Sequence, residues 1–145
     1  MTKTKITTLV GTRPELIRLS SIIKRFDEAF EHRIVHTNRN SDPNLLDVFL
    51  KDLKIRKPDK NLGITQTSLG GFLGDLMVKF EEEIENNPPQ GLVILGDTNS
   101  ALSAIIAKRL AIPVYHLEAG NRSFDENVPE EINRRIIDHF ADFNL

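Results

Sequence analysis

The sequence predicts an α/β domain in which helices cover both faces of a parallel sheet. Short apolar runs typical of buried strands alternate along the chain with longer segments whose apolar residues recur at helical spacing. That alternation is typical of parallel sheets joined by crossover helices. The chain has 145 residues, of which 39% are hydrophobic, which is enough for one domain with its own core. We therefore expect residues 1–145 to form a single domain.

The first predicted strand and helix enclose a turn in the stretch V-G-T-R-P-E-L-I-R, residues 10–18. The strand is expected at Lys5–Val10. The helix is expected over 14–26, because proline suits the first helical position, where its missing N–H costs nothing. One apolar stripe on this helix consists of Leu16, Leu19, Ile23 and Phe26.

The remaining elements continue the alternation. Further strands are expected at 32–37, Gly91–Leu95, Val114–Leu117 and, just beginning, 141–145. Further helices are expected at 44–53, 68–86, 100–110 and 130–140. The polar connector 54–62 could hold a short strand at its end, and the prolines after residue 87 stop the longest helix. The helix over 100–110 is apolar on most sides, so it should be well covered. The helix over 130–140 has one apolar face, made of Ile132, Ile136, Ile137 and Phe140.

Composition excludes several classes of function. The net charge is −2, so no electrostatic argument favours nucleic acid or an anionic membrane as a partner. The chain has no cysteine, hence no disulfide, thiolate metal site or cysteine nucleophile. Its four histidines lack metal-ligand spacing, so no metal site is expected. No apolar run approaches the roughly 20 residues that span a bilayer, and no signal peptide is apparent, which favours a soluble cytoplasmic protein.

Polar and charged residues follow the predicted strands. They are Gly11, Thr12 and Arg13 after the first strand, residues 37–40 after the second, residues 96–99 after Gly91–Leu95, and His116, Glu118, Gly120, Asn121 and Arg122 around the end of Val114–Leu117. Glu130 and Glu131 open the last helix. Ligands of open parallel sheets bind beyond the carboxyl ends of the strands. Several arginines beside carboxylates suit an anionic substrate that also needs acid–base catalysis.

Some of these residues also have a structural interpretation, which the sequence alone leaves open. Asp97 stands where a helix cap is common. Arg18 lies one turn into its helix, off the apolar stripe, and either reaches the turn or stays solvated. His116 is interpreted as a satisfied, partly buried histidine rather than a base.

The two glutamates of the last helix precede Arg134 and Arg135 by four residues. Ordinary i,i+4 pairing on a solvated face, helped by the helix dipole, explains that spacing. Without further information, the structural interpretation of Glu130 and Glu131 is favoured.

Two other classes of protein compete with an enzyme. A phosphoacceptor domain of the receiver type would use Asp97 as acceptor, but such domains need an acidic pair after the first strand, where this chain has Thr12 and Arg13. A binding module without chemistry is the other class, and the clustered carboxylates weigh against it.

Four motifs occur in order along the chain: G-T-R-P-E-L-I-R, L-G-D-T-N-S, H-L-E-A-G-N-R and P-E-E-I-N-R-R. Together they resemble the non-hydrolysing UDP-N-acetylglucosamine 2-epimerase family over essentially all 145 residues. The resemblance implies a Rossmann-like domain, the N-terminal half of a type-B glycosyltransferase-like fold. It also implies that the family's C-terminal, UDP-binding domain is absent here. Because the chain stops at Leu145 inside a predicted strand, we expect a fragment with negligible turnover by itself.

The activity that the resemblance implies is inversion at carbon 2 of a UDP-linked 2-acetamido sugar, by elimination and re-addition of UDP. No nicotinamide and no metal cofactor is implied. The implied partners are the UDP-sugar and a second copy of the chain, and the implied role is precursor synthesis for bacterial capsule or O-antigen. The alternative is a catalytically silent remnant or partner-binding domain of the same fold.

The resemblance also carries site residues, each matched to a family motif. The catalytic candidates are Asp97, Glu118 and Glu130, and which of them removes the proton is left open. The substrate-binding candidates are Arg13, Arg18, His116, Arg122, Asn133 and Arg134. One loop departs from the family: T-N-R-N-S-D at 37–42 replaces T-G-Q-x-x-D. The substrate therefore stays open between two branches of the family. The stretches R-K-P-D at 56–59 and E-A-G-N-R-S-F-D-E-N-V-P-E-E at 118–131 resemble most the branch forming UDP-N-acetyl-L-fucosamine. The alternative is the plain N-acetylglucosamine to mannosamine epimerases.

Overall fold

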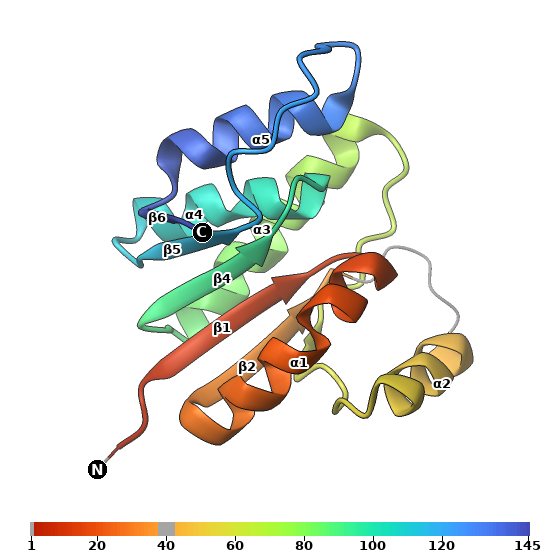
Figure 1. Ribbon diagram of the computed structural model, residues 1–145, viewed down its shortest axis with the longest axis vertical. Coiled ribbons are helices and arrows are strands. Elements are labelled where there is room, and N and C mark those ends of the chain that lie inside the picture. Colours follow the sequence, from red (N-terminus) through yellow and green to blue (C-terminus); the bar gives the residue numbers. More distant parts are fainter. Residues whose placement is uncertain (1, 38–42) are drawn as a thin grey trace.

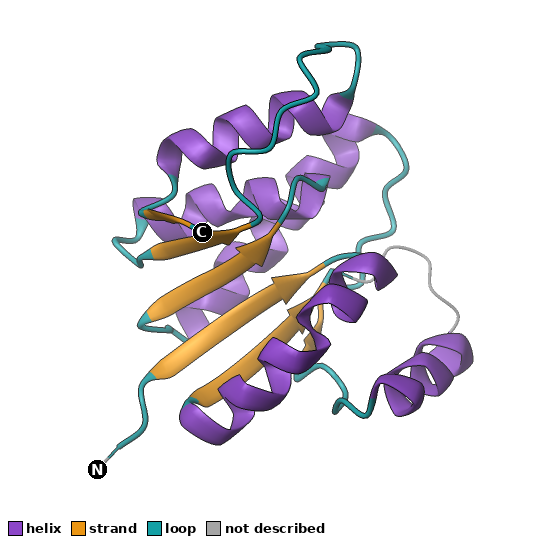
Figure 2. Ribbon diagram, viewed as in Figure 1, coloured by secondary structure: helices purple, strands orange, loops and turns teal. Residues whose placement is uncertain are grey.

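A six-stranded parallel sheet forms the centre of the molecule (Figures 1 and 2). The computed structural model describes residues 2–37 and 43–145. The strands, in chain order, are β1 (Lys5–Val10), β2 (Glu31–His36), β3 (Lys60–Asn61), β4 (Gly91–Leu95), β5 (Val114–Leu117) and β6 (Phe143–Asn144). Their order in the sheet is β3-β2-β1-β4-β5-β6, and every pair is parallel. The predicted parallel sheet is confirmed.

Helices cover both faces of the sheet, as predicted. They are α1 (Arg13–Ala29), α2 (Pro43–Leu53), α3 (Leu69–Asn86), the 3-10 helix η1 (Asn99–Ser103), α4 (Ala104–Arg109) and α5 (Pro129–Phe140). On one face, α1 and α2 form a core with Val10, Ile34 and Leu95. On the other face, α3, α4 and α5 pack against the strand residues that point the opposite way, such as Leu9 and Val35.

The strand order reverses between β1 and β4, and this reversal positions the site. From β1 the chain winds outward through β2 and β3, then crosses back by α3 and winds outward again through β5 and β6. The two crossovers that start at β1 and β4 leave on opposite faces, so their turns diverge and open a crevice at the carboxyl edge of the sheet.

Three helices differ from the sequence prediction, and α1 does so by continuing to Ala29, beyond the predicted end at residue 26. The segment expected to be helical over 100–110 begins as the 3-10 helix η1, where Ser103 Oγ donates to Ser100 O at 2.8 Å. It is well covered at Ala101, Ala104 and Ala107, whereas Ile105 and Leu110 are exposed.

The predicted apolar face of α5 is wrong in part. Ile132 and Ile136 are 47% and 44% exposed, and the buried residues of α5 are Glu131, Asn133 and Ile137. Polar side chains turn inward because they bond to the turns after β4 and β5. Phe140 is partly buried against the core, as expected.

The segment T-N-R-N-S-D at 37–42 differs from the family motif, and its residues 38–42 lie outside the described residues. Among the helices that the structure describes, none combines the length and apolar character needed to cross a membrane.

Candidate active site

The turn after β1 is held by the side chain of Glu15. Gly11 N donates to Glu15 Oε2 at 2.9 Å, and Thr98 Oγ1, from the turn after β4, donates to Oε1 at 3.3 Å. Glu15 is almost completely buried, and this burial raises its pKa, although hydrogen bonds from the turn residues lower it in part. Sequence reasoning missed Glu15, although the T-x-x-E spacing from Thr12 is that of a capping box. The carboxylate therefore joins the two turns that border the crevice.

The close approach of this turn to η1 explains why residue 11 is glycine. A Cβ on Gly11 would lie 2.8 Å from Ser100 Cβ and 3.1 Å from Thr37 Oγ1. We predict that Gly11→Ala lowers the free energy of unfolding by about 1–3 kcal/mol, since overpacking forces the neighbours apart. Urea unfolding measures the effect.

Gly70→Ala is the control, because nothing lies within 4 Å of a Cβ at Gly70. It should be neutral or stabilising. The double change Gly11→Ala with Ser100→Gly should recover part of the loss. A Gly11→Ala variant as stable as the unmodified chain would contradict the close approach.

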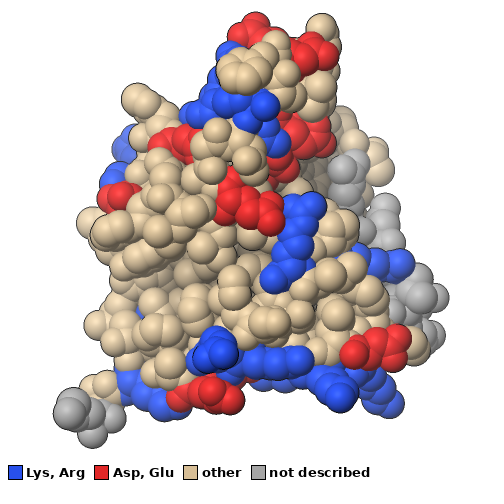
Figure 3. Space-filling model, in the orientation of Figure 1, with Lys and Arg blue, Asp and Glu red and all other residues tan. Residues whose placement is uncertain are grey.

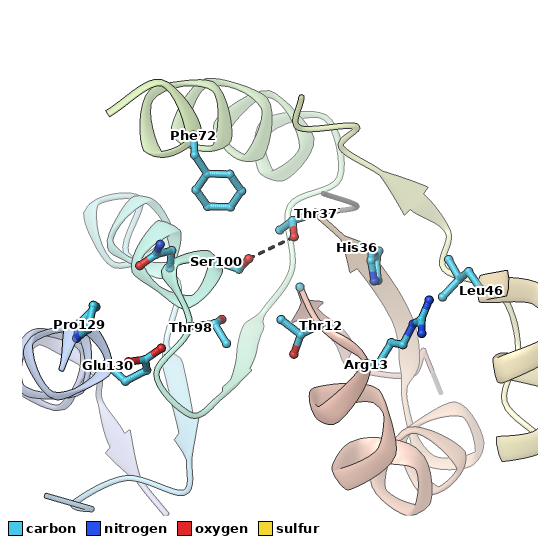
Figure 4. Close-up of a pocket in the computed structure, with 12 residues that line it drawn as sticks. Thr12, Arg13, His36, Thr37, Leu46, Phe72, Thr98, Ser100, Pro129 and Glu130 are labelled. Atoms are coloured by element: carbon cyan, nitrogen blue, oxygen red, sulfur yellow. Dashed lines mark hydrogen bonds between the residues drawn. The ribbon is translucent and has the colours of Figure 1, made fainter. Parts of the chain in front are cut away.

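A cavity of about 550 Å³ opens at the crevice. It is lined by Gly11, Thr12, Arg13, His36, Thr37, Leu46, Phe72, Thr98, Asn99, Ser100, Pro129 and Glu130. Figure 4 shows Arg13 and Glu130 on opposite sides of it, with Thr98 and Ser100 between them. Of the predicted site residues, Arg13 and Glu130 line the cavity, and neither forms an ion pair with any residue that the structure describes.

His36 adds an uncharged imidazole to the cavity wall. Burial lowers its pKa to about 4. The side chain is therefore neutral at pH 7, where it can both donate and accept a hydrogen bond. Its position in the predicted strand gave no signal of this role.

Asp97 is paired with Arg134 of α5 rather than capping the next helix. The residue at the cap of η1 is Thr98, so the capping interpretation of Asp97 is wrong. Arg134 Nη2 donates to Asp97 Oδ2, and Asn133 Nδ2 donates to Asp97 O at 2.9 Å and to Asn99 Oδ1 at 2.9 Å. Two adjacent residues of α5 thus fix the side chain and the backbone of Asp97.

Glu118 follows β5 and meets Arg18 from α1. Arg18 Nη1 donates to Glu118 Oε2 at 2.8 Å, so Arg18 stays partly exposed and reaches the turn after β5 rather than the turn after β1. Glu118 has φ 60°, in the left-handed region. Such a conformation is costly for a residue with a side chain and is typical of functional sites. The strain and the exposed carboxylate favour the functional interpretation of Glu118.

The two glutamates at the start of α5 have separate surroundings. Glu131 is completely buried and accepts hydrogen bonds from Ser123 N at 2.7 Å and Arg135 Nε at 3.0 Å. Arg134 Nη1 lies 3.3 Å from it. The Ser123 amide is the largest cause of its lowered pKa. Glu131 makes the expected i,i+4 pair with Arg135, but it is buried and not on a solvated face. The partners of Arg134 are Asp97 and Glu131, and Glu130 is exposed and lines the cavity.

Five of the six predicted binding residues, all except Arg13, lie outside the cavity lining. His116 is completely buried, with Nε2 2.6 Å from Gly96 O, and Arg122 Nη1 donates to Asp138 Oδ2 at 2.7 Å. Figure 3 shows acidic and basic side chains in contact along the upper part of one face, where α5 lies. Within residues 2–37 and 43–145, no group of three or more potential ligands is arranged to hold a metal ion.

The doubly wound sheet, with a cavity at its switch point, defines a Rossmann-like α/β domain. A family model described as UDP-N-acetylglucosamine 2-epimerase matches residues 24–145. The chain belongs to the UDP-N-acetylglucosamine 2-epimerase family.

Solved and curated relatives agree with this assignment. The structure of UDP-N-acetylglucosamine 2-epimerase from Rickettsia bellii is 48% identical, with a TM-score of 0.92 over 98% of this chain and 38% of that one. The Methanocaldococcus jannaschii enzyme, crystallised with UDP-GlcNAc and UDP, is 38% identical, with a TM-score of 0.89 over 95% of this chain and 39% of that one. UDP-2,3-diacetamido-2,3-dideoxy-D-glucuronate 2-epimerase from Pseudomonas aeruginosa is 38% identical over 95% of this chain and 40% of its own length. The chain spans about two fifths of the curated relatives that it matches.

Proposed function

We propose that the protein carrying this chain is a UDP-sugar 2-epimerase, to which the chain contributes the N-terminal domain. One observation carries the proposal beyond family membership: the cavity at the switch point has the Arg13 cation on one side and the Glu130 carboxylate on the other. An anionic sugar nucleotide needs the first, and acid–base chemistry at the sugar needs the second.

The proposed reaction proceeds in two balanced steps. A carboxylate takes the proton from carbon 2 while the bond from carbon 1 to the UDP oxygen breaks, which gives a 2-acetamidoglycal and UDP. UDP then adds back to carbon 1 as a proton is delivered to the opposite face of carbon 2. The reaction is redox-neutral overall. Asp97, Glu118 and Glu130 are the proposed acid–base groups.

Cations stabilise the leaving pyrophosphate in this scheme. Arg13 and Arg18 are the proposed contacts for the sugar or the pyrophosphate, and a second domain contributes most of the contacts to UDP. Asn133 and Arg134 support Asp97 directly. His116 and Arg122 act further from the cavity, through Gly96 O and Asp138. Displacement of Arg134 from Asp97, or of Arg18 from Glu118, by the substrate's own charge would free each carboxylate for catalysis.

The proposed setting is bacterial surface polysaccharide synthesis in the cytoplasm, for capsule or O-antigen, by a homodimer. The proposed substrate is the 6-deoxy-talose precursor of UDP-N-acetyl-L-fucosamine, and UDP-N-acetylglucosamine is the alternative. A catalytically silent, partner-binding domain stays the competing function, because Asp97 and Glu118 are each already paired with an arginine.

Deuterium incorporation at carbon 2 in heavy water tests the proposal. Both sugars would be offered to the full polypeptide encoded by the gene and to residues 1–145 alone. We expect incorporation with the full polypeptide and negligible incorporation with the 145-residue chain, since the chain without the second domain should bind UDP weakly. Asp97→Asn and Glu118→Gln should each reduce the rate by about 10²–10⁴-fold. Folded full-length protein that incorporates no deuterium into either sugar would favour the silent domain.

A further inference from the structure

A buried histidine–aspartate pair lies behind the turns that carry two of the catalytic candidates. His116 of β5 is completely buried, and the Asp138 side chain, near the end of α5, is 11% exposed. Nδ1 of His116 lies 2.8 Å from Oδ1 of Asp138. Among the residues that the structure describes, these are the buried side-chain polar atoms without an aligned hydrogen bond. Their 2.8 Å separation requires one proton between them, because a carboxylate oxygen and an unprotonated ring nitrogen can each only accept.

Each end of the pair holds a different turn. Gly96 O can only accept, so His116 Nε2, 2.6 Å away, carries a proton and donates it. At the other end, Asp138 Oδ2 accepts from Gly120 N at 3.0 Å and from Arg122 Nη1 at 2.7 Å. Gly96 directly precedes Asp97, and Gly120 stands two residues after Glu118. The pair therefore connects the backbone of one catalytic turn to the backbone of the other.

The turn after β5 needs such support. Glu118 has φ 60° and Gly120 has φ 79°, so two nearby residues are in the left-handed region. A left-handed glutamate persists only where its surroundings hold it. The Arg18 contact holds the carboxylate, but it joins two partly exposed side chains, and such pairs are weak. The Gly120 amide is held from inside the protein by Asp138.

We propose that Asp138 is a positioning residue for Glu118, which through His116 and Gly120 sets the separation between the Glu118 and Asp97 turns. The inference rests on the proposed function, because it assumes that the Glu118 carboxylate takes part in the proton transfers. Proton transfer depends steeply on geometry, and a displacement of about 1 Å can cost about 10²-fold in rate. Asp138 itself does not line the cavity.

Three variants of the full polypeptide test the proposal. Asp138→Ala removes both connections. Asp138→Asn keeps them, because its oxygen still accepts from Gly120 N and its amide nitrogen can donate to His116 Nδ1. Asp142→Ala is the matched control. Asp142 accepts from Val114 N at 2.9 Å, at the start of β5, and has no hydrogen bond to the turn that follows β5. Any general loss of stability should be shared by the two alanine variants.

The first readout is amide hydrogen exchange at Gly120, which does not depend on catalysis. We expect exchange at least about tenfold faster in Asp138→Ala, and nearly unchanged exchange in Asp138→Asn and Asp142→Ala. The second readout is epimerisation: Asp138→Ala should lower kcat about 10²-fold with KM little changed, and Asp138→Asn should restore most of it.

Two results would overturn the inference. One is unchanged exchange at Gly120 in Asp138→Ala, and the other is a kcat no lower than that of Asp142→Ala. If the unmodified protein shows no epimerisation, the proposed function fails and the Gly120 exchange still decides whether Asp138 holds the turn. Should Asp138→Ala not fold, a long-range ¹H–¹⁵N spectrum of the unmodified protein decides: His116 with Nε2 protonated supports the connection to Gly96, and Nε2 without a proton refutes it.

Discussion

Glu130→Gln is expected to reduce deuterium incorporation at carbon 2 by about 10²–10⁴-fold and to leave stability within about 0.5 kcal/mol of the unmodified protein. Glu130 is exposed on the cavity wall, and none of the described residues forms an ion pair with it. Replacing its carboxylate with an amide therefore removes an acid–base group and few structural contacts. The measurements are the exchange rate in heavy water and the melting temperature of the full polypeptide.

Glu131→Gln is the matched control, one residue along the same helix. Glu131 is completely buried against Ser123, Arg134 and Arg135. Arg134 keeps Asp97 and Arg135 keeps Glu126 as partners, but both lose the buried charge that they share, so the melting temperature should fall by roughly 10 °C. Because its pKa is lowered in the folded chain, this contribution is present above about pH 4.5 and is lost as the pH falls further. Equal effects of the two substitutions on stability would refute the assignment of separate roles.

Stability is expected to fall on mild acidification because of His36. Burial lowers its pKa from 6.5 to about 4, so the unfolded chain binds a proton that the folded chain does not take up between those values. The contribution of His36 to the free energy of unfolding is complete above pH 6.5. It is lost as the pH falls toward 4, at about 1.36 kcal/mol per pH unit, or about 3 kcal/mol in total. The lowered pKa of His32 acts in the same direction.

The comparison of His36→Gln with the unmodified protein isolates this contribution from the carboxylates that titrate in the same range. Urea unfolding at pH 7.5 and pH 4 gives the loss for each protein, and we expect the loss to be about 3 kcal/mol smaller in the variant. His139→Gln, at an exposed position of α5, should lose as much as the unmodified protein. A His36→Gln variant with the full acid loss would show that His36 titrates normally in the fold.

The sequence predicted the sheet well because parallel strands buried on both faces have a strong local signature. Lys5–Val10, Gly91–Leu95 and Val114–Leu117 are strands with the predicted bounds. The uncertain strand in the connector is only the two residues Lys60–Asn61, too short for a periodic signal. The inward face of α5 was predicted poorly, since its isoleucine spacing indicated one side while hydrogen bonds turned Glu131 and Asn133 inward.

The sequence predicted which residues lie at the carboxyl edge of the sheet where each stands beside a turn at that edge. Arg13 and Glu130 line the cavity there, whereas Arg18 contacts Glu118 instead of the turn after β1. Glu15 and Asp138 were missed because their roles depend on partners elsewhere: Thr98 is 83 residues from Glu15, and Gly120 is 18 residues from Asp138. Local spacing cannot show which carboxylates will be buried against distant turns.

Selection for stability and selection for activity should act differently on the left-handed backbone at Glu118. A glycine would adopt φ 60° without the cost of about 1–2 kcal/mol that a side chain imposes there, so a screen for heat resistance alone would tend to replace this glutamate. Under the proposed function, a screen for turnover would keep it. Residue 118 is therefore a position where sequence drift under relaxed selection for activity should first become visible, and glycine there would mark a descendant that has kept the scaffold and abandoned the chemistry.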